Sequence, residues 1–144
     1  STATENWQPN ISTVYQVILS IGCTLMVDDI YFNEPGEETK KGTPEGIRQN
    51  NAYCNIVKYG TAKYAILEQL KNPAAGFEQA IYSSFFVKKD VILSEIQSWI
   101  DAADTLDCSY TGFTNQHNHE IASKFAKEPG AFKQNLTEVY EEIK

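Results

Sequence analysis

The sequence predicts a single all-α domain, and three observations support this fold class. Apolar residues recur every three or four positions in several long stretches, which is the spacing of one face of an α-helix. No stretch of any length alternates apolar and polar residues in the way of a half-buried strand. The 144 residues, 42% apolar and 22% charged, are enough for one domain with its own core and too few for two.

Charge and cysteine content exclude several classes of protein. The net charge of −7 leaves no surplus of Lys and Arg to neutralise phosphates, so nucleic acid is not an expected partner. The longest apolar run, residues 14–27, is interrupted by Gln16, Ser20 and Thr24 and is too short and too polar to span a bilayer, so no membrane partner is expected. The three widely spaced cysteines do not form a disulfide framework, which favours a reducing compartment: the cytoplasm, with the nucleus as an alternative.

The first half of the chain predicts two helices separated by a long loop. Residues 12–27 predict a helix that is apolar on most sides and therefore central, with Ser12 as its N-cap and Pro9 keeping the entry extended. Residues 34–51 are polar and rich in Pro and Gly, which predicts a mobile surface loop. The next helix is expected to run to about Lys71, with Gly60 weakening it locally.

The second half predicts four further helices. One is expected to start near Pro73 and the next to be capped by Asp90. After a break at "CSYTGFTN" come two short amphipathic helices, split by Pro129-Gly130. The residues expected to face inward are Phe77, Ile81, Phe85 and Phe86 in the first, Ile92 or Leu93, Ile96, Trp99, Ile100 and Ala103 in the second, and Leu136, Val139, Tyr140 and Ile143 in the last.

The cysteines are weighed as nucleophiles and as core residues. Cys23 lies in the first apolar helix, where a free thiol behaves as a small hydrophobe. Cys54 lies near the expected start of a helix, whose dipole would lower a thiol pKa, although a neutral helical residue is the favoured interpretation. Cys108 and His117 could form a nucleophilic pair, but Asp107 and its acidic neighbour Asp104 disfavour the thiolate.

The motif "HNHE" is the candidate metal site. On a helix, His117 and His119 point in widely different directions, so they cannot share a metal ion with Glu120. We therefore expect exposed histidines and no metal. The chain also has no glycine-rich phosphate loop, nucleophile elbow or Cys-x-x-Cys motif, and no cofactor is expected.

The stretch "MVDDIYFNEPGEE" is unusual because a predicted loop places two aromatic residues, Tyr31 and Phe32, before a Pro-Gly turn. Together with the residues before it, "NWQPNISTVYQVILSIGCTLMVDDIYFNEPG" resembles the segment of a ubiquitin-conjugating enzyme that follows its catalytic cysteine. In that family a Trp and a nearby Pro precede a cap residue and a long central helix; here they are Trp7, Pro9 and Ser12.

The stretches "YFNEPG", "KKGTPEG" and "KYAILEQLKNP" make the resemblance narrower. They are similar to the conjugating domain of the large BIR-repeat-containing enzymes of the apollon/BRUCE type, through about Ile100. The resemblance implies the carboxy-terminal helical portion of an α+β ubiquitin-conjugating fold, with a central helix and a carboxy-terminal helical bundle. Residues 1–107 would hold the central helix, the gate loop, the polar loop 34–51 and the carboxy-terminal helices, and residues 108–144 a helical extension.

The resemblance also implies an active-site gate. In the family, the loop after the central helix borders the catalytic groove, and one acidic residue in it helps to orient or deprotonate the incoming lysine. This role carries over to Glu34, with Asn33 beside it. Tyr31, Phe32, Pro35 and Trp7 are then expected to be structural residues near the site. The same two aromatic residues are equally well explained as edge-of-core anchors of the loop.

The nucleophile is expected outside these residues. The family's catalytic cysteine and its His-Pro-Asn motif lie upstream of the Trp, and none of the three cysteines here falls at that position. We therefore expect the carboxy-terminal part of a conjugating domain, with a central helix whose uncovered face would favour self-association. The implied activity is to carry ubiquitin as a cysteine thioester and transfer it to substrate lysines.

Three functions remain open on the sequence. The first is this conjugating activity, with ubiquitin, ubiquitin-activating enzyme and a ubiquitin ligase as partners. The second is a non-catalytic module of the same shape that binds ubiquitin or a ligase. The third is an unrelated enzyme that uses Cys108 and His117.

Overall fold

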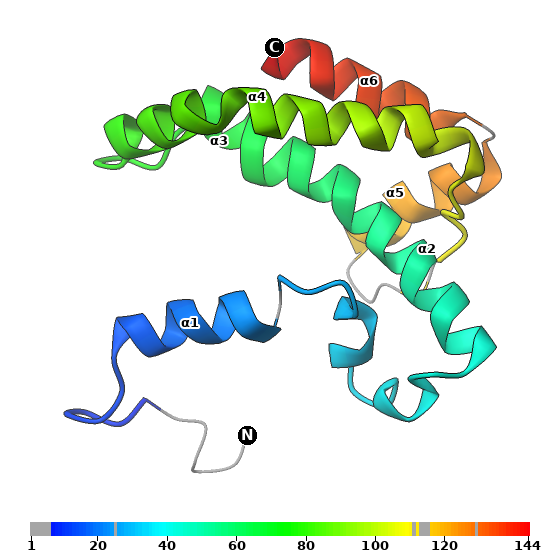
Figure 1. Cartoon of the computed structure of the whole chain (residues 1–144), viewed down its shortest axis with the longest axis horizontal. Coiled ribbons are helices and arrows are strands. Elements are labelled where there is room, and N and C mark those ends of the chain that lie inside the picture. Colours follow the sequence, from blue (N-terminus) through cyan, green and yellow to red (C-terminus); the bar gives the residue numbers. More distant parts are fainter. Residues whose placement is uncertain (1–6, 25, 111, 113–115, 129) are drawn as a thin grey trace.

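The computed structural model describes residues 7–24, 26–110, 112, 116–128 and 130–144, and no strand occurs among them. α2, η4 and α3 form one rod, α4 runs back along it, and α5 and α6 follow (Figure 1). The elements are α1 (Val14–Thr24), η2 (Ile30–Asn33), η3 (Glu38–Lys40), α2 (Pro44–Gly60), the π-helix η4 (Thr61–Leu67), α3 (Glu68–Lys71), α4 (Glu78–Ala102), η5 (Ala103–Thr105), α5 (Gln116–Lys127) and α6 (Ala131–Ile143).

The core lies where α4, η4, α5 and α6 meet the end of α2. Ile96 of α4 and Leu136 of α6 are its largest fully buried side chains. Rings from different elements stack edge-to-face, with 5.0 Å between the centroids of Tyr59 and Phe125 and 5.5 Å between those of Phe125 and Phe132. Residues on both sides of position 107 therefore share one core.

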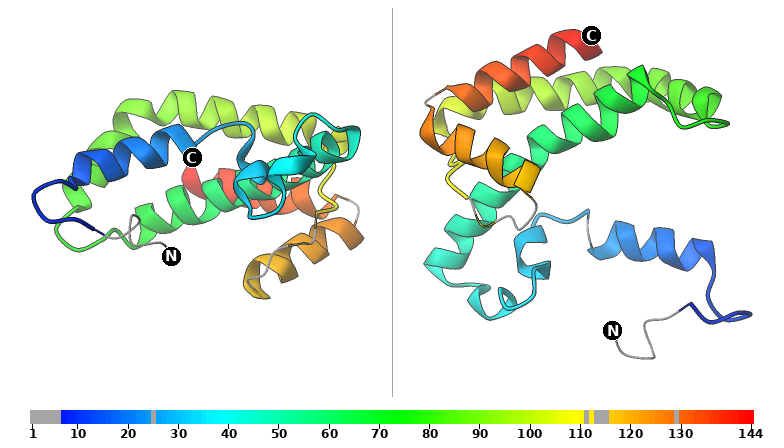
Figure 2. Two further views of the ribbon diagram at one scale, coloured as in Figure 1. Left: turned by 90° about the horizontal axis from the view of Figure 1, so that it is seen from below. Right: turned by 180° about the vertical axis from the view of Figure 1, so that it is seen from behind.

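The first helix forms as predicted, but it buries no residue. α1 projects to one side of the other helices (Figures 1 and 2), and Val14, Ile18 and Ile21 are 66%, 63% and 40% exposed. Its cap is Thr13 and not Ser12: Thr13 Oγ1 accepts from Gln16 N (3.2 Å) while Gln16 Oε1 accepts from Thr13 N (2.8 Å). The apolar face of this helix is thus available for packing.

The predicted loop 34–51 is wrong in its second part, because α2 begins at Pro44. Thr43 caps the helix by accepting a hydrogen bond from Gly46 N (3.0 Å), and Pro44 occupies the first turn. Gly46 is required here because a Cβ atom would lie 2.1 Å from Lys40 O. The polar composition that suggested a loop is instead that of a helix start on the surface.

The rod is not interrupted at Gly60, where the sequence predicted a local weakness, but its hydrogen bonding changes directly after this residue. From Thr61 the rod changes to a π-helix, in which Glu68 N–H bonds to Lys63 O five residues back, before α3 completes it at Lys71.

The two helices predicted on either side of Asp90 are one helix, α4. Asp90 is an exposed mid-helix residue, and Pro73 lies in the connection before the helix begins. Compared with alanine, an Asp inside a helix is unfavourable by only a few tenths of a kcal/mol, about 0.7 at most. Continuing the helix past Asp90 buries Ile96 and Ile100, and this burial outweighs that cost. The inward placement of Phe77 and Phe86 is also wrong, since they are 64% and 81% exposed.

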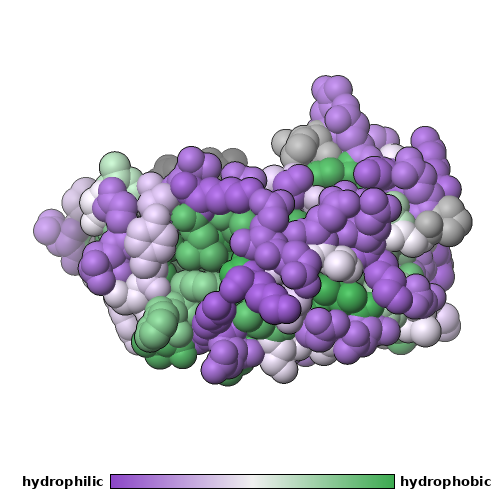
Figure 3. Space-filling model, turned by 90° about the horizontal axis from the view of Figure 1, so that it is seen from above, coloured by the Kyte–Doolittle hydropathy of each residue, from purple (hydrophilic) through white to green (hydrophobic). Residues whose placement is uncertain are grey.

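The other residues predicted to face inward in α4, η5 and α6 are buried or half-buried against the core, except Ile81, which is half-buried but outside the core cluster. Figure 3, which looks down on the side where α4 and α6 lie, shows apolar patches that interrupt a hydrophilic surface. Among the described helices, none combines the length and the apolar character needed to cross a bilayer.

Candidate functional site

The segment that carries the predicted gate is a short 3-10 turn, η2, placed beside the end of α1. Asn33 Nδ2 donates to Thr24 O, and Glu34 N donates to Tyr31 O at 3.1 Å. Pro35 and Gly36 follow as an exposed turn, in which Gly36 has φ of +93°, a value that favours glycine. Asn33 therefore links this segment to the carboxyl end of α1.

Tyr31 is the apolar anchor of this segment, because only 2% of it is exposed. Its ring contacts three others: the centroid distances are 5.3 Å to Phe32, 5.9 Å to Tyr53 on α2 and 5.6 Å to Tyr110. Tyr53 and Tyr110 also contact each other, at 5.2 Å. These four residues, here called the aromatic cluster, pack the gate on α2 and on the segment after η5.

Polar contacts hold the same segment. The buried side chain of Asn50 accepts from Tyr31 N at 3.2 Å and donates to Asp28 O at 2.9 Å. The Tyr31 hydroxyl donates to Glu37, and burial together with this carboxylate raises the pKa of Tyr31. The side-chain polar atoms that are buried in this segment each have a hydrogen-bond partner, so packing it on α2 leaves none of them unsatisfied.

Glu34 is exposed and is oriented by the aromatic cluster. The Tyr53 hydroxyl donates to Glu34 Oε1 at 3.2 Å. Burial, and then the charge of Glu34, raise the pKa of Tyr53 to about 12, so this hydroxyl keeps its proton at neutral pH. One carboxylate oxygen of Glu34 is thus held from the protein side while Glu34 and Asn33 face solvent.

Trp7 is not brought to the gate by any interaction among the described residues, and it is 56% exposed ahead of α1. Tyr31 and Phe32 take the anchoring role that the sequence suggested. Asn50, Tyr53 and Tyr110 also hold this segment, although no sequence pattern points to them. The first two fall in or beside the stretch assigned to a loop, and Tyr110 lies far along the chain, so only their position in space connects them with the gate.

The cysteine thiols differ in their surroundings. Cys23 is exposed on α1. Cys54 lies in the middle of α2 and not near its start; its Sγ is 3.3 Å from Asp28 O, and burial raises the pKa of the thiol. Burial and Asp107 raise the pKa of Cys108 to about 11. Cys54 and Cys108 are thus poor nucleophiles at neutral pH.

The histidine motif lies at the start of α5. His119 is exposed. The side chain of His117, and with it the predicted Cys108–His117 pair, lies outside the part of the chain that the structure describes. In the described ranges, no group of three or more His, Cys, Asp or Glu residues could hold a metal ion.

Comparison with known proteins shows that the chain is similar to ubiquitin-conjugating enzymes. The chain is 36% identical over 96 residues to human BIRC6, a dual ubiquitin-conjugating enzyme and ubiquitin-protein ligase; the match covers 67% of this chain and 2% of that protein. It is 37% identical over 101 residues to a probable ubiquitin-conjugating enzyme of Acanthamoeba polyphaga mimivirus, covering 70% and 7% of the two chains.

A third relative is a probable ubiquitin-conjugating enzyme of Caenorhabditis elegans, 40% identical over 97 residues, or 67% of this chain and 13% of the relative. No family model matches the chain. The chain thus spans only a small part of the length of these relatives. Through the region that they share, it belongs to the ubiquitin-conjugating enzyme family.

Proposed function

We propose that this chain supplies the gate and the carboxy-terminal helices of a domain that carries ubiquitin as a cysteine thioester and transfers it to substrate lysines. The match to ubiquitin-conjugating enzymes over two thirds of the chain is the observation that carries the proposal. Its partners are then ubiquitin, ubiquitin-activating enzyme and a ubiquitin ligase, and it works in the cytoplasm or the nucleus.

The chemistry assigned to the gate is lysine activation by Glu34. A free lysine has a pKa of about 10.4 and is almost entirely protonated, hence not nucleophilic, at neutral pH. A carboxylate at the gate can orient the ammonium group and accept its proton as the amine attacks the thioester carbonyl. The geometry supports this role, because Tyr53 holds one oxygen of Glu34 and leaves the carboxylate exposed.

The thioester cysteine is proposed to lie outside Cys23, Cys54 and Cys108. The raised pKa values of Cys54 and Cys108 support this, because a thiol that stays protonated cannot accept ubiquitin efficiently. Cys23 lies on the apolar helix α1, whose exposed face is proposed to pack on other parts of the conjugating domain.

A thioester assay tests the assignment of the nucleophile. The assay compares the full-length protein with its triple variant C23S/C54S/C108S. Each protein is incubated with activating enzyme, ubiquitin and ATP and run on a non-reducing gel. A thiol-sensitive adduct on both proteins is the expected result. An adduct that the triple variant loses would place the nucleophile among these three residues. No adduct on either protein would favour the alternative, a non-catalytic module that binds ubiquitin or a ligase.

Discharge of the charged protein to free lysine tests the gate. Glu34→Gln removes the charge but keeps the shape, and we expect a discharge rate at least about tenfold lower, since general base groups contribute roughly 10²–10⁴-fold. The matched control is Glu38→Gln, a nearby exposed carboxylate on η3, with a rate within about twofold of the unaltered protein. Equal discharge rates for the two variants would show that Glu34 takes no part in the transfer, even where the thioester itself forms.

A further inference from the structure

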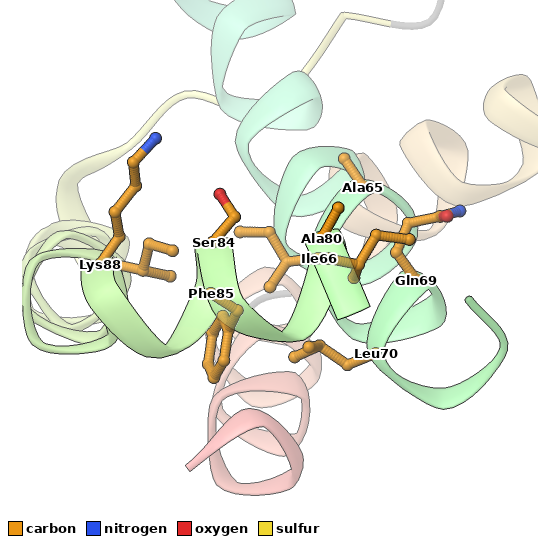
Figure 4. Close-up of a pocket in the computed structure, with 10 residues that line it drawn as sticks. Ala65, Ile66, Gln69, Leu70, Ala80, Ser84, Phe85 and Lys88 are labelled. Atoms are coloured by element: carbon orange, nitrogen blue, oxygen red, sulfur yellow. The ribbon is translucent and has the colours of Figure 1, made fainter. Parts of the chain in front are cut away.

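A groove runs between α4 and the rod formed by η4 and α3, away from the gate. It encloses about 530 Å³, and Ile66 and Leu70 line one side while Ile81 and Ile92 line the other. We call this the α4 groove. The lining also includes the short side chains of Ala65, Ala80 and Ser84 (Figure 4), which leave room between the larger residues of the two walls.

Polar groups mark the two ends of the groove. Lys88 stands at one end and Gln69 at the other (Figure 4). Within the described part of the chain, Lys88 makes no hydrogen bond or ion pair, in contrast to Lys89, which donates to Lys144 O at 2.9 Å, and Lys71, which pairs with Glu142. Among the described residues, Lys88 is therefore an unpaired cation at one end of the α4 groove.

Exposed apolar side chains of α4 flank the groove along its length. Val87 and Val91 are 81% and 73% exposed and lie three residues after Ser84 and Lys88, on the same side of the helix. From Ala80 to Ile92 the groove follows α4 for about 18 Å, the length of roughly three helical turns. The opposite wall includes the π-helix η4, a geometry that is frequent at functional sites.

We propose that the α4 groove binds an amphipathic helix of a partner protein, with apolar anchors at helical spacing and an acidic residue that pairs with Lys88. An extended peptide is a poor occupant, because the walls are helices whose backbone groups are already bonded and offer no strand edge. The length of the groove and its unpaired cation instead match a short helix with a carboxylate at one end.

A second copy of this chain is a poorer occupant than a partner protein. α1 is its uncovered apolar helix, but it has no acidic side chain between Val14 and Thr24 that could meet Lys88. The apolar faces of α5 and α6 already contribute to the core. The groove therefore fits a helix whose charge this chain does not provide, and this inference does not depend on the proposed function.

Fluorescence anisotropy with two labelled helical peptides of about fourteen residues tests the inference. Both carry leucines at i, i+3 and i+7 spacing, and they differ only in having glutamate or lysine at each end. We expect the glutamate peptide to bind with a micromolar Kd and the lysine peptide at least about tenfold more weakly. Equal binding of the two peptides, or no binding of the glutamate peptide, would overturn the proposal.

Three variants locate the binding. Ser84→Arg fills the groove and should raise the Kd of the glutamate peptide about tenfold or more. The control Ser83→Arg changes an exposed position outside the groove and should change this Kd less than about twofold. Lys88→Glu, at the rim, should reverse the preference between the two peptides without disturbing the core. Retained preference in Lys88→Glu refutes the charge pairing. A dimer in sedimentation that Ser84→Arg dissociates would assign the groove to a second copy and also overturn the proposal.

Discussion

Replacing Tyr31 by alanine should release the gate from α2 while the helical core stays folded. Tyr31 is almost fully buried, yet the rings that it contacts, those of Phe32, Tyr53 and Tyr110, are not part of the core that α4, η4 and α6 share. Loss of these ring contacts in Tyr31→Ala should therefore cause local opening of residues 26–40 and not global unfolding.

The magnitude follows from the contacts that the substitution removes. Truncating a buried aromatic side chain to alanine costs about 3–5 kcal/mol. Because every 1.4 kcal/mol is a factor of about ten, the open population of the segment should rise by roughly 10²- to 4 × 10³-fold. Tyr31→Phe keeps the ring and loses only the hydroxyl bond to Glu37, so it should cost about 0.5–1.5 kcal/mol, at most about tenfold.

Hydrogen exchange measures this opening directly. The amides to follow are Phe32 N, bonded to Asp29 O at 3.1 Å, and Glu34 N, bonded to Tyr31 O at 3.1 Å. Phe86→Ala serves as the control, since this ring is 81% exposed and its loss should change little. Unchanged exchange of residues 26–40 in Tyr31→Ala, or equal acceleration throughout α2–α6, would refute the anchoring role of the aromatic cluster.

Two further predictions concern the core. Leu136→Ala, at a fully buried position of α6, should lower the free energy of unfolding by about 2–5 kcal/mol in urea titration, and a loss below 1 kcal/mol would mean that α6 is not part of the cooperative core. Iodoacetamide should label Cys108 more slowly than the exposed Cys23 at pH 8 by mass spectrometry, because the pKa of Cys108 is about 11. Faster labelling of Cys108 than of Cys23 at pH 8 would contradict the burial of Cys108. Because the pKa of Cys108 is higher in the folded than in the unfolded chain, its contribution to the free energy of unfolding is fully present below pH 9 and should be lost as the pH rises from 9 to about 11.

The helices were predictable where apolar spacing and burial agree. The apolar positions of α6, such as Leu136 and Val139, lie in the core as their period requires. The errors occurred where a local signal opposed a tertiary one. Asp90 has the chemistry of a cap, but packing of the residues after it keeps α4 continuous, and the polar start of α2 is stabilised by Thr43 at a position where composition alone favours a loop.

The structure of the segment proposed to be the gate was predictable only in part. Sequence resemblance drew attention to Glu34 and Asn33, and the adjacent aromatic residues indicated an anchored segment. Three other side chains fix this segment: Asn50, Tyr53 and Tyr110. They lie 19, 22 and 79 residues from Tyr31 along the chain. Neither periodicity nor local motif links residues at such separations, so the cluster emerges only from the fold.

The π-helical turns of η4 have a consequence for how this chain is aligned with related sequences. A π turn holds one more residue than an α turn, so it absorbs an insertion without changing the phase of the helix on either side. A sequence lacking one residue between Thr61 and Leu67 could form ordinary α turns and still direct Tyr59 and Leu70 toward the same core. A one-residue gap at this point of an alignment is therefore compatible with an unchanged fold.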